Sequence, residues 1–290
     1  MSQPKGILIP VGGAEDKGTD LEAGIIERNR LNFMELGILK TISSYIHGQD
    51  KRIEVITTAS MIPDEVADNY IEAFGKLGLQ NVGHMRIRSR EEVPEYLERL
   101  KDCDAVMFSG GNQLRLSSIF GGTEFLDILQ KRYQTEDFII AGTSAGAMAM
   151  SNNMIYEGNA GRAHLKGEVR MTSGLGFLNH VIIDSHFDKR GRFARLAQAV
   201  AANPGAMGIG LGEDTGVVVR HGTQIEAIGS GAVTIVDGRN VVHNNIADID
   251  FGMPISVEGL VVHIMSKGNV FDLATKSFVE YAIPEVNLED

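Results

Sequence analysis

Short apolar runs alternate with helix-like stretches through the first two thirds of the chain, and this alternation restricts the fold more than any other feature. The strand-like runs cover residues 6–13, 53–60, 82–87, 105–111 and 138–143. Helix-like stretches follow them, near Arg28–Ile46, from Pro63, over 90–102, over 112–120 and after Ser144. The pattern predicts an α/β fold with a mostly parallel sheet and helices on both faces. Ligands of such sheets bind beyond the carboxyl ends of the strands.

The last third of the chain has a different sequence pattern. From about residue 205, short strand-like runs such as "GIGLGEDTGVVVR" and "GLVVHIMSKGNVFDL" are separated by glycine, aspartate and asparagine turns. Closely spaced strands of this kind favour antiparallel pairing. We interpret residues 205–290 as an antiparallel β extension and the whole chain, 1–290, as one α/β domain.

Residues 142–146, "GTSAG", match the G-x-S-x-G pattern of a nucleophile elbow. The pentapeptide follows an apolar strand and precedes an alanine- and methionine-rich helix, which is the context that the pattern requires. Ser144 is therefore the candidate nucleophile, and the N–H of Ala145 is a candidate donor to an oxyanion. The "SGGNQ" loop offers a second donor from Gly111 or Asn112. We expect the glycines of "GGAEDKG" (12–18) to serve only a turn.

A serine hydroxyl needs a neighbouring base and an oriented carboxylate to act as a nucleophile. Of the eight histidines, His186 follows the apolar run "VIID" at the strand end where the elbow also lies. Glu213, at the end of "GIGLGE", is the preferred carboxylate, with Asp214, Asp188 and Glu157 as alternatives. The residues thus predict a Ser-His-Glu site.

Basic residues cluster beside the candidate histidine in "DSHFDKRGRFAR". In an acidic protein, such residues next to a catalytic site favour binding of carboxylates. Asp184 offers a partner for a guanidinium or ammonium group, so the expected ligand carries both charges. The cluster comprises Asp184, Lys189, Arg190, Arg192 and Arg195.

With these motifs, the chain resembles the serine peptidase family that includes the cyanophycinases and the aspartyl dipeptidases. The motifs are "GGAEDKG", "GGNQLRL", "GTSAGAMAMS", "DSHFDKRGRFARL", "GIGLGEDT" and "GNVFDL", in that order. The resemblance implies a class I glutamine amidotransferase-like (flavodoxin-like) fold and a homodimer. It also implies an exopeptidase that releases β-aspartyl-arginine from cyanophycin, a polyaspartate with arginine on each side-chain carboxylate.

The resemblance also assigns the site. It places the nucleophile, base and acid on Ser144, His186 and Glu213. It places the substrate pocket on Gln113, Asp184, Ser185, Arg190, Arg192 and Arg195. Ser185 stands where the family has glutamine, which shortens one pocket wall, and Asn112 where an aspartate is common. No metal or organic cofactor is expected.

Composition excludes several other classes of function. The formal charge of −11 argues against partners such as nucleic acid or an anionic membrane surface. Cys103 is the single cysteine, so neither an internal disulfide nor a thiolate metal cage is possible. The start "MSQPKGILIPVGG" shows no signal peptide, and no apolar run approaches the roughly 20 residues of a membrane span. We expect a cytoplasmic protein.

Three alternative functions remain to be weighed. An α-aspartyl dipeptidase of the same family would share the triad but not the branched substrate. A non-catalytic binding module on this fold would be marked by a replaced serine or histidine, and neither Ser144 nor His186 is replaced. Glutamine amidotransfer would need cysteine at the elbow, whereas Cys103 lies elsewhere.

Overall fold

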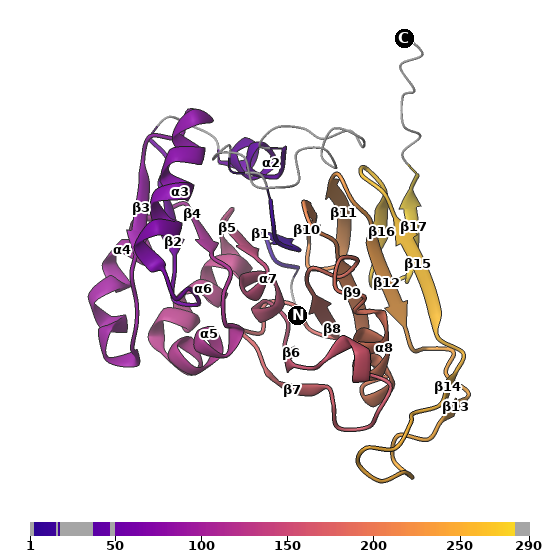
Figure 1. Cartoon of the computed structure of the whole chain (residues 1–290). Helices are drawn as coiled ribbons and strands as arrows, with labels where there is room; N and C mark the ends of the chain where they lie inside the picture. The colour runs from indigo at the N-terminus through magenta and orange to yellow at the C-terminus, as the bar shows by residue number, and fades with distance from the viewer. Residues whose placement is uncertain (1–2, 16, 18–36, 47–49, 282–290) are drawn as a thin grey trace.

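The structure is a computed structural model that describes residues 3–15, 17, 37–46 and 50–281. Its centre is a mixed sheet that has nine strands among these residues, in the order β17-β16-β11-β10-β1-β5-β4-β2-β3. Figure 1 shows the strands in this order from right to left. The strands at the core of the fold are parallel: β1 (Ile7–Val11), β2 (Ile53–Ile56), β3 (Val82–Met85), β4 (Ala105–Phe108) and β5 (Ile139–Thr143).

The parallel strands end together at one edge of the sheet. β1 pairs with β5 up to Val11 and Thr143, and β4 pairs with β5 up to Phe108 and Gly142. All residues of β4 and β5 are buried, as expected for strands covered on both faces. The loops that follow β1, β4 and β5 therefore meet, and they contain the three predicted glycine corners.

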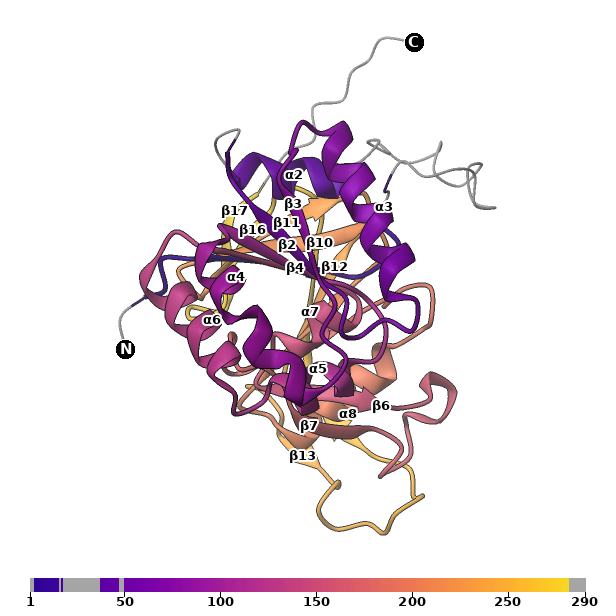
Figure 2. The same ribbon diagram turned by 90° about the vertical axis from the view of Figure 1, so that its left-hand side faces the viewer.

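Helices cover both faces of this sheet (Figure 2). The side chains of Ile9, Val11 and Val55 pack against α2 and α3, whereas those of Leu8, Ile56 and Val106 pack in the core on the opposite face. The first face carries α2 (Gly37–Tyr45) and α3 (Pro63–Lys76). The second carries η1 (Arg90–Tyr96), α4 (Leu97–Asp102), α5 (Gln113–Phe120), α6 (Glu124–Thr135) and α7 (Ala145–Ala149).

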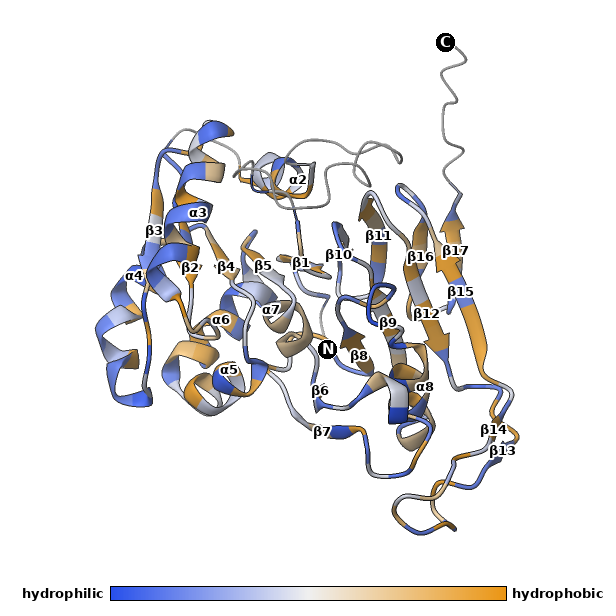
Figure 3. Cartoon of the chain, in the orientation of Figure 1, coloured by the Kyte–Doolittle hydropathy of each residue, from blue (hydrophilic) through white to orange (hydrophobic). Residues whose placement is uncertain are grey.

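The β-rich last third extends the main sheet and, together with the earlier strand β8, builds a second one. β10 (Thr215–Arg220) pairs antiparallel with β1, and β11 (Gln224–Gly229), β16 (Val270–Asp272) and β17 (Ser277–Glu280) continue from it. The second sheet, four-stranded in the described part of the chain, has the order β15-β12-β9-β8. Its strands are β8 (Val181–Asp184), β9 (Met207–Leu211), β12 (Val233–Asp237) and β15 (Val261–Met265). Figure 3 shows hydrophobic stretches along strands of both sheets.

The remaining elements are short. β6 (Asn153–Glu157) pairs with β7 (Arg170–Ser173), and β13 (His243–Asn244) pairs with β14 (Val257–Glu258). η2 (Ala160–Arg162) lies between β6 and β7, and α8 (Phe193–Ala202) connects β8 to β9. None of the helices in the described residues is long and apolar enough to cross a membrane.

Two predicted helices differ in detail from the structure. Residues 90–102 begin as the 3-10 helix η1, with Pro94 inside it, and become α-helical at Leu97. Proline lacks the N–H that an α-helix needs at that point, which explains the change. Of the helix predicted near Arg28–Ile46, the described part is Gly37–Tyr45, and residues 28–36 lie outside the described residues.

Candidate active site

Three consecutive carbonyl groups, that of the last residue of β1 and those of the two glycines after it, hold the backbone of the site. The bonds run from Ser144 N–H to Val11 O at 2.8 Å, from His186 N–H to Gly12 O at 2.8 Å and from Asp214 N–H to Gly13 O at 2.9 Å. Asp214 directly follows Glu213 in the chain. The end of one buried strand therefore fixes the serine, the histidine and the carboxylate loop relative to one another.

Ser144 occupies the sharp turn between β5 and α7. Its backbone has φ 50° and ψ −107°, a conformation that non-glycine residues rarely adopt. The turn is tight enough that a Cβ at Gly146 would lie 2.5 Å from the carbonyl oxygen of Phe108. Within the described residues, the serine hydroxyl makes no capping bond to α7 and instead faces His186.

A hydrogen-bonded relay connects the three predicted catalytic side chains. Ser144 Oγ lies 3.1 Å from His186 Nε2, and His186 Nδ1 lies 2.9 Å from Glu213 Oε1. This is the nucleophile–base–carboxylate order of a serine hydrolase triad. His186 also has a positive φ, of 47°, so both ends of the serine–histidine contact depend on an unusual backbone conformation.

The alternative carboxylates have other partners. Asp214 accepts a hydrogen bond from Ser230 Oγ at 2.6 Å, and Glu157 pairs with Arg170 at 3.1 Å. Asp188 lies next to the relay, where its Oδ1 is 3.4 Å from the N–H of Glu213. The carboxylate at hydrogen-bond distance from His186 is that of Glu213.

The loop after β4 lies beside the elbow, as the sheet order requires. A Cβ at Gly110 would be 3.5 Å from the Cβ of Ser144. The N–H of Asn112 donates to Ala59 O at 3.0 Å, and its side chain caps α5 by accepting from the N–H of Leu114 at 2.9 Å. Both the N–H and the side chain of Asn112 are thus already hydrogen-bonded. Gly111 is therefore the better candidate for a second oxyanion donor beside Ala145.

Two members of the predicted basic cluster, Arg192 and Arg195, pair with Asp184 at the end of β8, whereas Lys189 lies 3.8 Å from Glu213 Oε2. Asp184 is fully buried, and its carboxylate accepts hydrogen bonds from both arginines. Arg195 donates from Nε at 2.8 Å and also from Nη2, and Arg192 donates from Nη1 at 3.2 Å. Burial lowers the pKa of Arg192 to about 10, so its guanidinium is still charged at neutral pH. The charge of Asp184 is already balanced within the chain.

Gln113 and Ser185 meet at a residue that sequence reasoning missed, Met148 in α7. Gln113 Nε2 lies 4.0 Å from the Met148 sulfur and donates to Ile155 O at 2.9 Å. Ser185 is buried, and its hydroxyl lies 3.2 Å from the same sulfur. The sequence signal for Met148 is its position one helical turn after Ser144.

Glu15 is a second residue that sequence reasoning missed. Residues 12–18 are expected to serve only a turn, but the Glu15 side chain is fully buried. It accepts hydrogen bonds from Tyr70 and from Thr143 Oγ1, the latter at 2.6 Å, and pairs with Lys17 at 3.0 Å. Because Thr143 precedes Ser144, Glu15 supports the elbow. The sequence signal that could have identified Glu15 is a carboxylate in a loop at the same edge of the sheet as the elbow.

The ionisation of Glu15 follows from these contacts. Burial alone would raise the pKa of Glu15, but the Lys17 ammonium and the Thr143 and Tyr70 hydroxyl groups outweigh it and lower the pKa below 4.5. Burial and the adjacent carboxylate raise the pKa of Tyr70 well above 10. At neutral pH the Glu15 side chain is therefore ionised, and its carboxylate accepts hydrogen bonds from the protonated Tyr70 and Lys17 and from Thr143.

Ser144 and His186 open into a cavity of about 520 Å³. Its lining is Gly13, Ala14, Glu15, Lys17, Val66, Asn69, Tyr70, Gly110, Gly111, Thr143, Ser144, His186 and Arg190. Of the predicted pocket residues, Arg190 lines this cavity, whereas Gln113, Asp184, Ser185, Arg192 and Arg195 do not. The described residues contain no group of three or more histidine, cysteine, aspartate or glutamate side chains placed to hold a metal.

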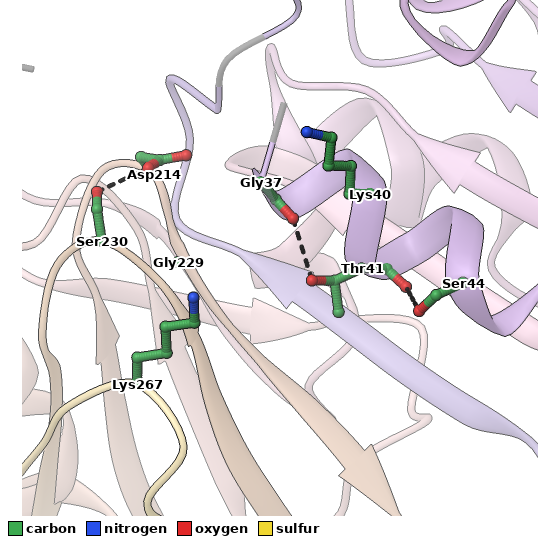
Figure 4. Close-up of a pocket in the computed structure, with 8 residues that line it drawn as sticks. All are labelled: Gly37, Lys40, Thr41, Ser44, Asp214, Gly229, Ser230 and Lys267. Atoms are coloured by element: carbon green, nitrogen blue, oxygen red, sulfur yellow. Dashed lines mark hydrogen bonds between the residues drawn. The ribbon is translucent and has the colours of Figure 1, made fainter. Parts of the chain in front are cut away.

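A smaller cavity, of about 210 Å³, lies between α2 and the turns around β11 (Figure 4). Lys40 of α2 and Lys267 line it, together with Asp214 and Ser230. Ser144 does not line this cavity, but Asp214, the residue after Glu213, does. Cys103 lies outside both cavities and is buried, which raises the pKa of its thiol to about 12. It is poorly suited to nucleophilic chemistry.

The fold and the relay define an α/β protein of the serine hydrolase type, and comparison with known proteins identifies the family. The family model "Peptidase family S51" matches residues 32–228. A cyanophycinase of Synechococcus elongatus is 36% identical over 273 residues, which cover 93% of this chain and 80% of that protein. The chain belongs to peptidase family S51, and it is a hydrolase homologous to cyanophycinases.

Two solved structures support the fold. A peptidase from an acI-B1 Actinobacterium aligns with a TM-score of 0.62 and 21% identity, over 94% of this chain and 98% of that one. A putative peptidase E protein from Listeria monocytogenes EGD-e aligns with a TM-score of 0.51 and 15% identity, over 80% and 100%. The predicted class I glutamine amidotransferase-like α/β fold is confirmed, with a sheet that is mixed around a parallel core.

Gly13 gives a direct test of how closely the imidazole is fitted. It has φ +111°, and a Cβ there would lie 2.4 Å from Cε1 of His186. We expect Gly13→Ala to displace the ring and slow fluorophosphonate labelling of Ser144 about 100-fold, the usual effect of a misplacement of about 1 Å. The control is Gly205→Ala, where a Cβ meets nothing within 4 Å. Labelling of Gly13→Ala at the normal rate would contradict the geometry.

Glu15 predicts a pH dependence of stability. A carboxylate whose pKa is lowered by folding stabilises the folded state above its ordinary value of 4.5, and this contribution is lost as pH falls through the lowered pKa. We expect Glu15→Gln to reduce the free energy of unfolding by about 1–3 kcal/mol at pH 7, and by progressively less below pH 4.5. Urea denaturation at several pH values measures this.

Glu136→Gln is the matched control for Glu15→Gln, because Glu136 is half-exposed and pairs with Arg132 on the surface. The free energy of unfolding of Glu136→Gln should change with pH in the same way as that of the unmodified protein. A Glu15→Gln deficit that stays constant from pH 7 to pH 3 would contradict the assigned ionisation.

Proposed function

We propose that this protein is a serine exopeptidase that hydrolyses cyanophycin to β-aspartyl-arginine. The observation that carries the proposal is the Ser144–His186–Glu213 relay, with contacts of 3.1 and 2.9 Å, at the carboxyl edge of the parallel strands. The homologous cyanophycinases, which match over nearly the whole chain, support the choice of substrate.

In the first step, His186 Nε2 removes the proton of Ser144 as Oγ attacks the carbonyl carbon of the amide that joins the terminal dipeptide unit to the polymer. Glu213, bonded to Nδ1, holds the ring in the orientation that makes Nε2 the acceptor and stabilises the imidazolium. The N–H groups of Gly111 and Ala145 receive the developing oxyanion.

In the second step, the imidazolium of His186 gives its proton to the leaving amine, and the C–N bond breaks. The other product remains as an ester on Ser144. Water, deprotonated by His186, then attacks the ester and regenerates the hydroxyl. The described residues supply each proton transfer of this cycle.

The basic cluster supplies the substrate pocket in this proposal. Arg190 lines the cavity and binds a free carboxylate of the polymer end. Ser185, Arg192 and Arg195 do not line the cavity itself; in this proposal they hold the end of β8 next to His186, because Asp184 pairs with both guanidinium groups. Gln113 Nε2 is bonded to Ile155 O, so the remaining carbonyl oxygen of its amide is the acceptor that we propose for the arginine branch.

Incubation with insoluble cyanophycin tests the function. We expect release of β-aspartyl-arginine, identified by mass, and a loss of at least about 10⁴-fold in kcat for Ser144→Ala. Turnover of α-aspartyl dipeptides instead of the polymer would favour the aspartyl dipeptidase. Absence of both activities, with no fluorophosphonate labelling of the unmodified protein, would favour a non-catalytic binding module.

We also propose that the active form is a homodimer, which the resemblance to the cyanophycinase family implies. Val262 and Ile264 are exposed on β15, the outer strand of the second sheet as described, and offer apolar area for such a contact. Light scattering is expected to give twice the chain mass of 31.4 kDa. A single-chain mass at micromolar concentration would contradict the dimer.

A further inference from the structure

We infer that Lys17, held in place by the buried carboxylate of Glu15, is a specificity-determining residue that binds a substrate carboxylate on the α3 wall of the active-site cavity. The inference rests on the proposed function, because it concerns the same cavity. It names a group outside the arginine cluster, on the segment "GGAEDKG" to which the mechanism assigns no role.

The ammonium group of Lys17 contacts a carboxylate and an aromatic ring. Lys17 Nζ lies 3.0 Å from Glu15 Oε1 and 5.0 Å from the centre of the Tyr70 ring. Both contacts favour a cation, the first by charge and the second through the face of the ring. Glu15 also accepts from Thr143, the residue before Ser144. The ammonium is thus connected to the nucleophile by two contacts and one peptide bond.

The two members of the ion pair differ in what they present to the cavity. The Glu15 side chain is fully buried, and its two oxygens receive Tyr70, Lys17 and Thr143. The Lys17 side chain keeps 24% exposure and lines the cavity together with Ser144. An ammonium has three N–H donors and the pair with Glu15 uses one, so Lys17 is the member of the pair able to meet a ligand.

The chemistry of the cavity favours an anionic group as that ligand. Lys17 and Arg190 line it, and among the described lining residues the one acidic side chain, that of Glu15, is engaged as described. The product β-aspartyl-arginine shows that each arginine of the polymer is linked through its amino group, so each branch keeps a free α-carboxylate. Two cations from different segments allow two carboxylates of a branched substrate to be held on either side of the cut amide.

Kinetics on a matched pair of substrates test the inference. One substrate is a soluble β-aspartyl-arginine oligomer, and the other is the same oligomer with arginine α-carboxamides. For the carboxylate oligomer, we expect Lys17→Met to raise KM at least about tenfold and to leave kcat within about twofold, the pattern of lost ground-state binding. Lys17→Arg should restore most of the KM, because it keeps a cation.

Two controls distinguish binding from support of the fold. With the carboxamide oligomer, Lys17→Met and the unmodified protein should have equal KM. Lys40→Met, in the smaller cavity, should change neither parameter. An unchanged KM for Lys17→Met, or a fall in kcat of the same size with both oligomers, would overturn the inference while leaving the proposed function intact.

A failure of the proposed function gives a separate result. If the unmodified protein cleaves neither oligomer, fluorophosphonate labelling of Ser144 in the presence of β-aspartyl-arginine still measures binding in the cavity. Protection of the unmodified protein that is at least about tenfold weaker in Lys17→Met would support the inference. Equal protection of both proteins, or protection of neither, would overturn it.

Discussion

The end of β1 is the constraint on which the rest of the site depends. The carbonyl group of its last residue and those of the two glycines that follow accept the backbone N–H groups of Ser144, His186 and Asp214, at 2.8 to 2.9 Å. Serine and histidine both adopt positive φ, which costs about 1–3 kcal/mol for each residue and persists only where the surrounding structure imposes it. The buried strand and its hydrogen bonds impose it here, so the rigid core of the sheet determines the geometry of the relay.

Individual ion pairs and hydrogen bonds in the cavity, more than the electrostatic field of the whole protein, explain how an acidic protein accepts the proposed substrate. The chain carries a formal charge of −11, but each unit of cyanophycin brings one carboxylate and one guanidinium and has little net charge to be steered. Discrimination must come from individual contacts inside the cavity. Arg190 lines that cavity, and Asp184 pairs with Arg192 and Arg195.

The fold and the proximity of Ser144 to His186 were predictable from the sequence, because periodicity and strand-end motifs depend on local order along the chain. The strands, the elbow at Ser144 and the position of His186 beyond "VIID" follow from such patterns. What could not be predicted depends on contacts between distant segments. Glu15 meets Tyr70 and Thr143, Asn112 gives its N–H to Ala59, and Asp184 is saturated by its own arginines.

The division of the site between two sheets has a consequence for biosynthesis. Ser144 follows β5 of the main sheet, His186 follows β8 of the second, and Glu213 lies in the connection from β9 back to β10. A nascent chain therefore exposes its serine before it possesses either partner, and a hydroxyl without a base is inert. A fragment that stops short of the β9–β10 connection lacks Glu213 and therefore cannot form the complete relay.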